Sequence, residues 1–118
     1  MRECELERKF GKLVRAAGGK AYKFLSPGND GVPDRLVVLP GGRIGFVELK
    51  RKGEKPRKQQ MYRIRELVSM GCFTAVVDDL ETAETVIARI QAQVPVAEDS
   101  LFLEMINQRP CTQTGGRP

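Results

Sequence analysis

The sequence contains no histidine and only three cysteines among its 118 residues. The missing histidine excludes Ser-His-Asp and Cys-His nucleophilic catalysis, histidine-ligated zinc and every enzyme that uses histidine as its general base. The cysteines, Cys4, Cys72 and Cys111, are far apart and odd in number, so they predict neither a disulfide framework nor a paired-cysteine metal site. Hydrolytic chemistry in this chain would therefore depend on carboxylates, lysine and a hard metal ion.

Long hydrophobic runs are also missing. No apolar run approaches the roughly 18 residues that a membrane span needs, and the charged start MRECELERKF lacks the apolar stretch of a signal peptide. Hydrophobic residues make up 41% of the chain and charged residues 30%, which is the balance of a soluble globular protein. We therefore expect a single cytoplasmic domain with one core.

Positive charge is concentrated in one segment. The chain has a net charge of +5, but residues 50–65 contain eight basic side chains against one acid, a local +7 that leaves −2 for the remainder. Such a segment attracts a polyanion through phosphate contacts and counterion release, so nucleic acid is the natural partner. A solvated helix face is the alternative. We favour nucleic acid because the segment starts at the end of a candidate catalytic strand.

The first third of the chain predicts one helix, one strand and one loop. Apolar residues at spacings of three and four predict an amphipathic helix over residues 3–17, which Gly18-Gly19 ends. Residues 20–25 contain aromatics between turn formers and indicate a strand. Residues 26–34, SPGNDGVPD, consist mostly of turn formers and indicate a loop.

The middle of the chain predicts a hairpin followed by a parallel strand. Two apolar segments flank Pro40-Gly41-Gly42, which indicates an antiparallel pair. A helix that precedes a fully apolar strand suggests that this strand joins the sheet in parallel. The expected order is α-β-β-β-α-β-α, an α/β fold with a mixed central sheet flanked by helices, and its later elements are strands 35–40 and 43–50, helix 57–70, strand 73–77 and helix 82–94.

The C-terminal residues form a separate stretch. We expect the folded domain to cover residues 1–95 and a C-terminal extension to cover residues 96–118. The extension contains DSLFLEMINQ, which predicts a short apolar helix, and then a tail rich in Gly, Pro, Thr and Gln. The apolar residues need cover, which either a second subunit or a fold back onto the same domain could provide.

Three residues on the predicted hairpin could carry metal-dependent hydrolysis. Asp34 stands where the glycine-rich loop meets the first strand, and Glu48 and Lys50 lie near the end of the second strand. Alternate residues of a strand point to the same face, so Glu48 and Lys50 should project together while Leu49 turns into the core and offers its main-chain carbonyl as a further metal ligand. Two carboxylates suit Mg²⁺, and Lys50 could orient or help to deprotonate a water, or stabilise charge on a phosphate.

The spacing brings the two acids together. Five residues separate Asp34 from the turn and five separate the turn from Glu48, so antiparallel pairing places them side by side. A Pro-Asp pair alone is more often an ordinary turn, and a Glu-x-Lys alone is more often a solvent-facing salt-bridge row. Their combination with a following basic helix is more specific, and repulsion between the two carboxylates would itself favour a bound cation.

The segment GNDGVPDRLVVLPGGRIGFVELKRKGEKPRKQQ resembles the VRR-NUC domain, the virus-type replication-repair branch of the PD-(D/E)xK nucleases, and especially its short stand-alone phage members. The resemblance covers roughly residues 1–80. It implies a restriction-endonuclease-like core and cleavage of DNA with Mg²⁺ or Mn²⁺. It makes branched or structured DNA a plausible substrate, because related domains act in repair and resemble junction resolvases, and it implies a phage protein or one in the cytoplasm of a bacterial host.

The resemblance also assigns candidate site residues. The metal-binding acids of the family fall on Asp34 and Glu48, and its catalytic lysine falls on Lys50. A glutamine of the family about ten residues after that lysine matches Gln60, with Gln59 as the near alternative. The acid of the first helix is Glu3 or Glu7, one helical turn apart, and Glu3 fits the family spacing better.

Several further residues are candidates for DNA contact. Arg35 would reach a phosphate or pair with an acid, while Gly28 and Gly31 would either let the backbone approach the scissile strand or serve as plain turn residues. Phosphate contacts without sequence readout are expected from basic residues after the second hairpin strand, namely Lys52, Lys55, Arg57 and Lys58.

The leading hypothesis is a structure-selective endonuclease that acts as a homodimer, because two related sites would most easily cut both strands of a branch. A DNA-binding module of the same fold without useful activity, and an exonuclease, are the alternatives.

Overall fold

The computed structural model describes residues 2–96 together with Met105 and Ile106. Over this part of the chain the elements follow the predicted order, and their bounds are α1 (Glu3–Ala16), β1 (Lys20–Lys23), β2 (Arg35–Leu39), β3 (Arg43–Leu49), α2 (Lys58–Ser69), β4 (Thr74–Val77) and α3 (Leu80–Gln91).

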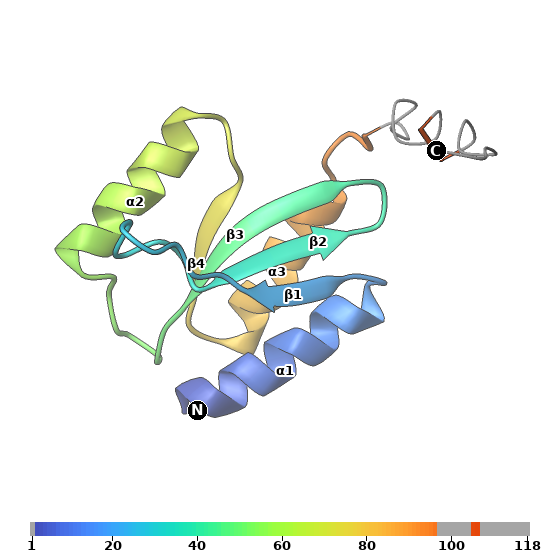
Figure 1. Ribbon diagram of the computed structural model, residues 1–118. Coiled ribbons are helices and arrows are strands. Elements are labelled where there is room, and N and C mark those ends of the chain that lie inside the picture. The colour runs from blue at the N-terminus through green and yellow to red at the C-terminus, as the bar shows by residue number, and fades with distance from the viewer. Residues whose placement is uncertain (1, 97–104, 107–118) are drawn as a thin grey trace.

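The four strands form one mixed sheet in the order β1-β2-β3-β4 (Figure 1). β1, β2 and β3 pair antiparallel, and β4 pairs parallel to β3. The parallel pairing follows from the connection, because the chain returns through α2 before it enters the sheet again. The α/β architecture and the parallel edge strand expected from the sequence are thereby confirmed.

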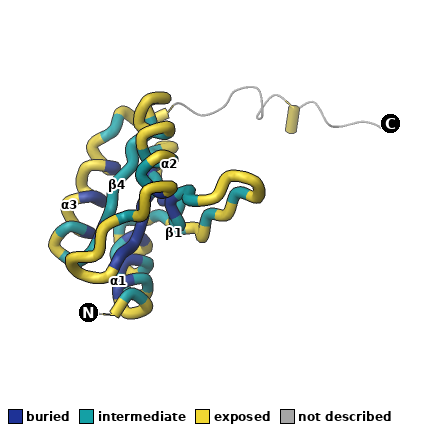
Figure 2. Tube along the Cα trace, turned by 90° about the vertical axis from the view of Figure 1, so that its left-hand side faces the viewer, coloured by how far each residue is buried: buried dark blue, intermediate teal, exposed yellow. Residues whose placement is uncertain are grey.

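One face of the sheet carries the hydrophobic core. On β2 and β3, alternate residues Val37, Leu39, Val47 and Leu49 are at most 2% exposed. α1 and α3 pack against this face and against each other, and Figure 2 shows buried residues along both helices. The helical residues that complete the core are Leu6, Phe10, Val14, Ala83, Val86, Ile87 and Ile90. The opposite face is covered differently, because α2 contacts the edge strand β4 rather than the middle of the sheet.

The hairpin turn depends on two glycines. Gly41 and Gly42 have φ angles of 85° and 71°, a left-handed backbone conformation that residues with a Cβ rarely adopt. This turn fixes the pairing of Leu39 with Arg43 and hence the register of the whole hairpin.

Element ends differ from the sequence prediction by one to three residues. β1 ends at Lys23 rather than at residue 25, and Phe24 N–H still donates to the Asp34 carbonyl directly before β2. α3 begins at Leu80 rather than residue 82, because the Asp79 carboxylate accepts a hydrogen bond from Thr82 N–H at 2.8 Å and caps the helix there. The helix predicted for residues 99–108 lies outside the described residues, apart from helical Met105 and Ile106.

No helix of the described chain is both long enough and apolar enough to cross a membrane.

Candidate active site

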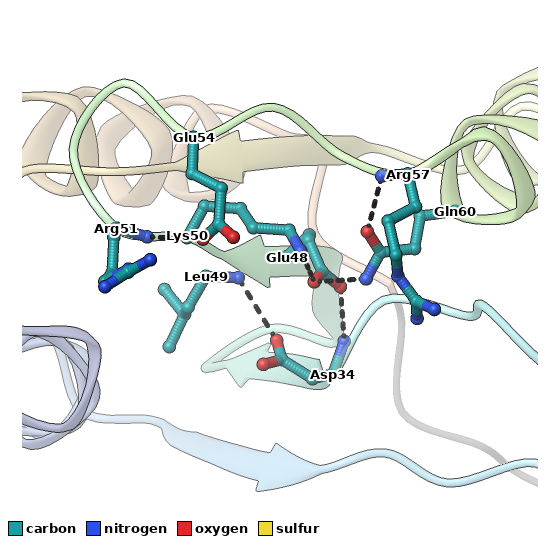
Figure 3. Close-up of polar contacts among 8 residues, drawn as sticks. All are labelled: Asp34, Glu48, Leu49, Lys50, Arg51, Glu54, Arg57 and Gln60. Atoms are coloured by element: carbon teal, nitrogen blue, oxygen red, sulfur yellow. Dashed lines mark hydrogen bonds and ion pairs between the residues drawn. The ribbon is translucent and has the colours of Figure 1, made fainter.

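The register of the hairpin brings Asp34 and Glu48 together. Arg35 pairs with Val47 in the antiparallel ladder. Asp34, directly before Arg35, therefore lies opposite Glu48, directly after Val47. Asp34 N–H donates to Glu48 Oε1 at 3.2 Å, and Leu49 N–H donates to Asp34 Oδ1 at 3.2 Å (Figure 3). Each acid is therefore held by the backbone of the other's strand, as the spacing in the sequence predicts.

Glu48 is buried, with 4% of its surface exposed, and it lies among donors. Its Oε2 accepts a hydrogen bond of 2.8 Å from Gln60 Nε2 and lies 3.6 Å from Lys50 Nζ. Gln60 in turn accepts from Arg57 N–H at 2.8 Å through its Oε1, which closes the first turn of α2. One side chain thus connects the start of α2 to the carboxylate on β3.

The structure separates the two neighbouring glutamines. Gln60 is buried against Glu48, whereas Gln59 is exposed and donates to the Asp30 carbonyl at 3.2 Å. Of the two positions left open by the sequence, Gln60 is the one that reaches the site.

Asp34 faces the first helix. Carboxylate oxygens of Glu3, Glu7 and Asp34 lie within 4.8 Å of one another. Glu7 Oε1 is also paired with Arg35 Nη2 at 3.0 Å, while Glu3 lines the same cavity as Asp34 and Glu48. The pairing of Glu7 favours Glu3 as the acid that α1 contributes to the cavity.

The two strand acids point in different directions. Figure 3 shows the Asp34 carboxylate beneath Leu49 N–H and the Glu48 carboxylate turned towards Gln60 and Lys50. Accordingly, the oxygen cluster among the described residues includes Asp34 and the α1 acids but not Glu48. The donors explain this, because a buried carboxylate gains more from Lys50 and Gln60 than from a second carboxylate. A cation shared by Asp34 and Glu48 would require a change in the Glu48 side-chain torsions.

These residues surround a cavity of about 380 Å³. Its walls come from α1, the loop before β2, the end of β3 and the start of α2, so the cavity lies where four segments of the chain meet. The residues that matter for its chemistry are Glu3, Asp34, Glu48, Lys50, Arg57 and Gln60.

Burial makes both strand acids harder to ionise. It is the largest cause of a raised pKa at Asp34, and Glu7 and Glu3 raise it further, while Leu49 N–H and Arg35 oppose the shift. Burial likewise raises the pKa of Glu48, with Asp34 adding to the effect and Lys50 opposing it. A divalent cation would reverse this balance by stabilising the charged forms.

The donor set fits a hard cation. All candidate side-chain ligands are carboxylate oxygens, the type that Mg²⁺ and Mn²⁺ prefer, and those of Glu3, Glu7 and Asp34 already lie within 4.8 Å of one another. Glu3, Asp34 and Glu48 would hold the ion, with the Leu49 main-chain carbonyl as a further ligand.

The predicted DNA contacts fall into two groups. Lys55 and Lys58 are exposed, and Arg57 lines the cavity. Lys52 is exposed but paired with Asp79 Oδ2 at 2.6 Å, and Arg35 is held between Glu7 and the Asp34 carbonyl. A phosphate contact by Arg35 or Lys52 would therefore require breaking an existing ion pair.

Gln59 and Arg63 anchor the glycine-rich loop, a role that the sequence did not predict for either residue. The carbonyl of Asp30 accepts hydrogen bonds from Gln59 Nε2 at 3.2 Å and from Arg63 Nε at 3.1 Å. Gln59 and Arg63 are four residues apart on α2, and this spacing on one helix face was the signal available in the sequence. The loop that leads to Asp34 is thus fixed to the helix that supplies Gln60.

Comparison with known proteins finds similarity both in sequence and in structure. The sequence matches no family model. The chain is 49% identical over 78 residues to a protein of Acyrthosiphon pisum secondary endosymbiont phage 1 named "Putative nuclease p44", and the match covers 66% of this chain and 84% of the phage protein. Among solved structures, a chain described as "VRR_NUC domain" superposes with a TM-score of 0.69 at 30% identity, covering 73% of this chain and 94% of the other.

Sequence identities of 49% and 30%, over 84% and 94% of the two relatives, are higher than proteins that share only a fold usually show. Together with the Pro-Asp and Glu-x-Lys positions that meet at the cavity, they show that this chain belongs to the VRR-NUC family of the PD-(D/E)xK nucleases.

Proposed function

We propose that this chain is a Mg²⁺- or Mn²⁺-dependent deoxyribonuclease that cuts branched DNA as an endonuclease. The observation that carries the proposal is the cavity in which Glu3, Asp34, Glu48 and Lys50 converge beside the basic start of α2. Asp34, Glu48 and Lys50 are each held by the contacts described above, and the Glu48 carboxylate would turn towards Asp34 when a cation binds.

The bound cation would polarise the scissile phosphate and lower the pKa of a water. The side chains of the protein would position the carboxylate ligands and stabilise the negative charge that develops on the phosphate. Gln60 donates to Oε2 of Glu48 through a 2.8 Å hydrogen bond and so keeps this carboxylate next to the start of α2. Lys50, 3.6 Å from Glu48, is placed to orient the attacking water or to stabilise charge on the phosphate oxygens.

Substrate binding is proposed to use the sugar-phosphate backbone rather than bases. Lys55 and Lys58 are exposed and close in sequence to Arg57, which lines the cavity. Such contacts give affinity and orientation without sequence readout. Among the described residues no element has the form of a groove-reading module, so selectivity would come from the shape of the DNA.

The proposal is tested with a panel of labelled flap, fork, bubble and four-way-junction DNAs, each compared with a plain duplex in Mg²⁺ or Mn²⁺. We expect cleavage of at least one branched substrate well above the duplex, and none by the Asp34→Ala variant. Binding by the wild type without cleavage would identify a DNA-binding module instead. Cleavage of linear DNA but not of closed circular DNA would identify an exonuclease.

The homodimer is part of the same proposal, because two sites would cut both strands of a junction in one encounter. Light scattering coupled to gel filtration measures it directly. A monomeric mass over the concentrations at which the enzyme cuts both strands would contradict it.

A further inference from the structure

A second hollow lies on the sheet face opposite the core. Its volume is about 750 Å³, and it is lined mainly by apolar side chains of β2, β3 and the end of α2, including Leu36, Ile44, Phe46, Val68 and Phe73. Ile44 is 43% exposed and Val68 53% exposed, so this groove is open. Several neighbouring apolar side chains that remain in water are a stronger signal than a single exposed one.

The residues described directly after α3, residues 92–96, lie at the rim of this groove. After α3, Gln93 lines the groove and its side chain forms two hydrogen bonds with the Ile44 backbone, at 3.3 Å and 2.8 Å. Arg43 Nε donates to the Gln93 carbonyl at 2.9 Å, and Val96 N–H donates to the Gly41 carbonyl at 2.6 Å. The following residues therefore start next to the open face.

The following residues are also apolar. Residues 101–106 read LFLEMI, and positions 101, 102, 105 and 106 would share one face of a helix. Met105 and Ile106 are helical and are 60% and 46% exposed. The described residues thus include both an open apolar groove and, at Met105 and Ile106, exposed apolar side chains.

Distance permits the two to meet. The four linking residues 97–100 span up to about 13 Å when extended. Ile44 and Phe46 lie two and four residues along β3 from the turn that holds Val96, which is roughly 7 and 13 Å. The segment therefore reaches the middle of the groove without any rearrangement of the core.

The solved VRR_NUC domain is shorter than this chain. The solved VRR_NUC domain is matched over 94% of its length by only 73% of this chain, so about a quarter of this chain has no counterpart there. Apolar residues of an extension to the shared fold gain stability when they are buried on a surface that this fold leaves open.

From these observations we infer that residues 101–106 bind in the groove formed by Leu36, Ile44, Phe46 and Val68 of the same chain. The inference is independent of the nuclease activity. It also has a consequence for the site, because Phe46 in the groove packs on Phe24 with 5.5 Å between ring centroids, and Phe24 lines the active-site cavity. The bound segment would support that wall from outside, and its apolar residues would need no second copy for cover.

Cys72 lines the groove and reports on its occupancy. In the full chain with Cys4→Ser and Cys111→Ser, Cys72 is the remaining thiol, and its alkylation rate is measured. We expect Leu101→Asp/Phe102→Asp to accelerate alkylation at least tenfold. The control Gln108→Asp/Thr112→Asp adds the same charge outside the apolar hexapeptide and should leave the rate unchanged. Equal rates in all three proteins would overturn the inference.

A second probe distinguishes the same chain from a second copy. The sequence has no tryptophan, so Phe102→Trp gives a single emission signal. We expect blue-shifted emission that is independent of protein concentration from 1 to 100 µM, and a red shift when Val68→Asp is added. Emission of a fully hydrated indole, or a blue shift that develops only with rising concentration, would contradict binding within one chain.

Discussion

At the scale of single residues, the site is defined by two strand acids, the buried Glu48 and the half-buried Asp34. Asp34 and Glu48 each accept a hydrogen bond from the other's strand, and both have a raised pKa because burial disfavours their charged forms. In metal-free protein the charged forms of both carboxylates are therefore disfavoured, and a bound divalent cation would stabilise these charged forms.

This arrangement predicts how stability depends on pH. A folded-state pKa above the unfolded value of about 3.9 means that the native state binds more protons between the two values. The free energy of unfolding then falls as pH rises from the unfolded pKa to the raised folded pKa. Above the folded pKa the full destabilisation by the charged carboxylate is present. We expect Asp34→Asn to raise the melting temperature of metal-free protein at pH 7, with the difference shrinking as pH falls towards 4.

The same melting experiment with metal provides the control. At 100 times its Kd, Mg²⁺ would stabilise the wild type by about 2.7 kcal/mol and leave Asp34→Asn nearly unchanged. An Asp34→Asn protein that melts below the wild type at pH 7 without metal, or one that gains as much as the wild type from Mg²⁺, would contradict the assignment of Asp34.

Gln60 and Gln59 provide a matched pair. Gln60→Leu leaves a buried Glu48 oxygen and Arg57 N–H without their partner, so we expect a loss of about 1–3 kcal/mol of stability and a drop of about 10–100-fold in cleavage. Gln59→Leu removes one exposed hydrogen bond and should cost under about 1 kcal/mol with cleavage nearly intact. Thermal unfolding and single-turnover cleavage measure both, and similar defects in the two variants would be inconsistent with this structure.

At the scale of elements, the sequence predicts the order of helices and strands and the pairing of β2 with β3. It can do so because the spacing of apolar residues and the choice of turn residues are local features of the chain. The alternation of apolar residues and the Pro-Gly-Gly turn establish the β2–β3 register, and this register alone brings Asp34 to Glu48. The orientation of Glu48 towards Gln60 and the pairing of Glu7 with Arg35 were not predictable in the same way. They depend on where α1 and α2 pack, which is decided by contacts between residues far apart in the chain.

The loop before β2 offers a test at this scale. Gly28 and Gly31 have φ angles of 83° and 91°, but a Cβ on Gly28 would meet nothing within 4 Å, whereas one on Gly31 would lie 2.8–2.9 Å from Gln59. Gly28→Ala should therefore cost about 1–2 kcal/mol from backbone strain alone. Gly31→Ala should cost more and also reduce cleavage, since the clash displaces the loop that leads to Asp34. Equal unfolding free energies for the two variants would contradict the contact with α2.

At the scale of the whole molecule, the charge distribution separates binding from chemistry. Basic side chains follow β3 and begin α2, while the acids that would hold a cation lie inside the cavity between α1 and β3. DNA would therefore meet an exposed basic surface first and reach the carboxylates of the cavity only at the scissile phosphate.

Salt dependence of binding tests this separation. Lys55→Gln and Lys58→Gln should each weaken binding similarly for all DNA sequences and reduce the slope of log K against log salt by about 1. Lys52→Gln should have a smaller effect, because its ammonium is already paired with Asp79 at 2.6 Å. Lys12→Gln and Lys20→Gln, which remove charge from exposed positions elsewhere, serve as controls, and slopes as strongly changed by these two would refute the proposed binding surface.

The most direct test of the account is single-turnover cleavage of a labelled four-way junction in Mg²⁺ by Lys50→Met. Lys50 is buried beside Glu48, and Lys23→Met removes the same charge from an exposed position on β1. We predict that Lys50→Met cuts about 10²–10⁴ times more slowly than the wild type while binding the junction as tightly as Lys23→Met. Cleavage by Lys50→Met within a few-fold of Lys23→Met would show that the chemistry takes place elsewhere.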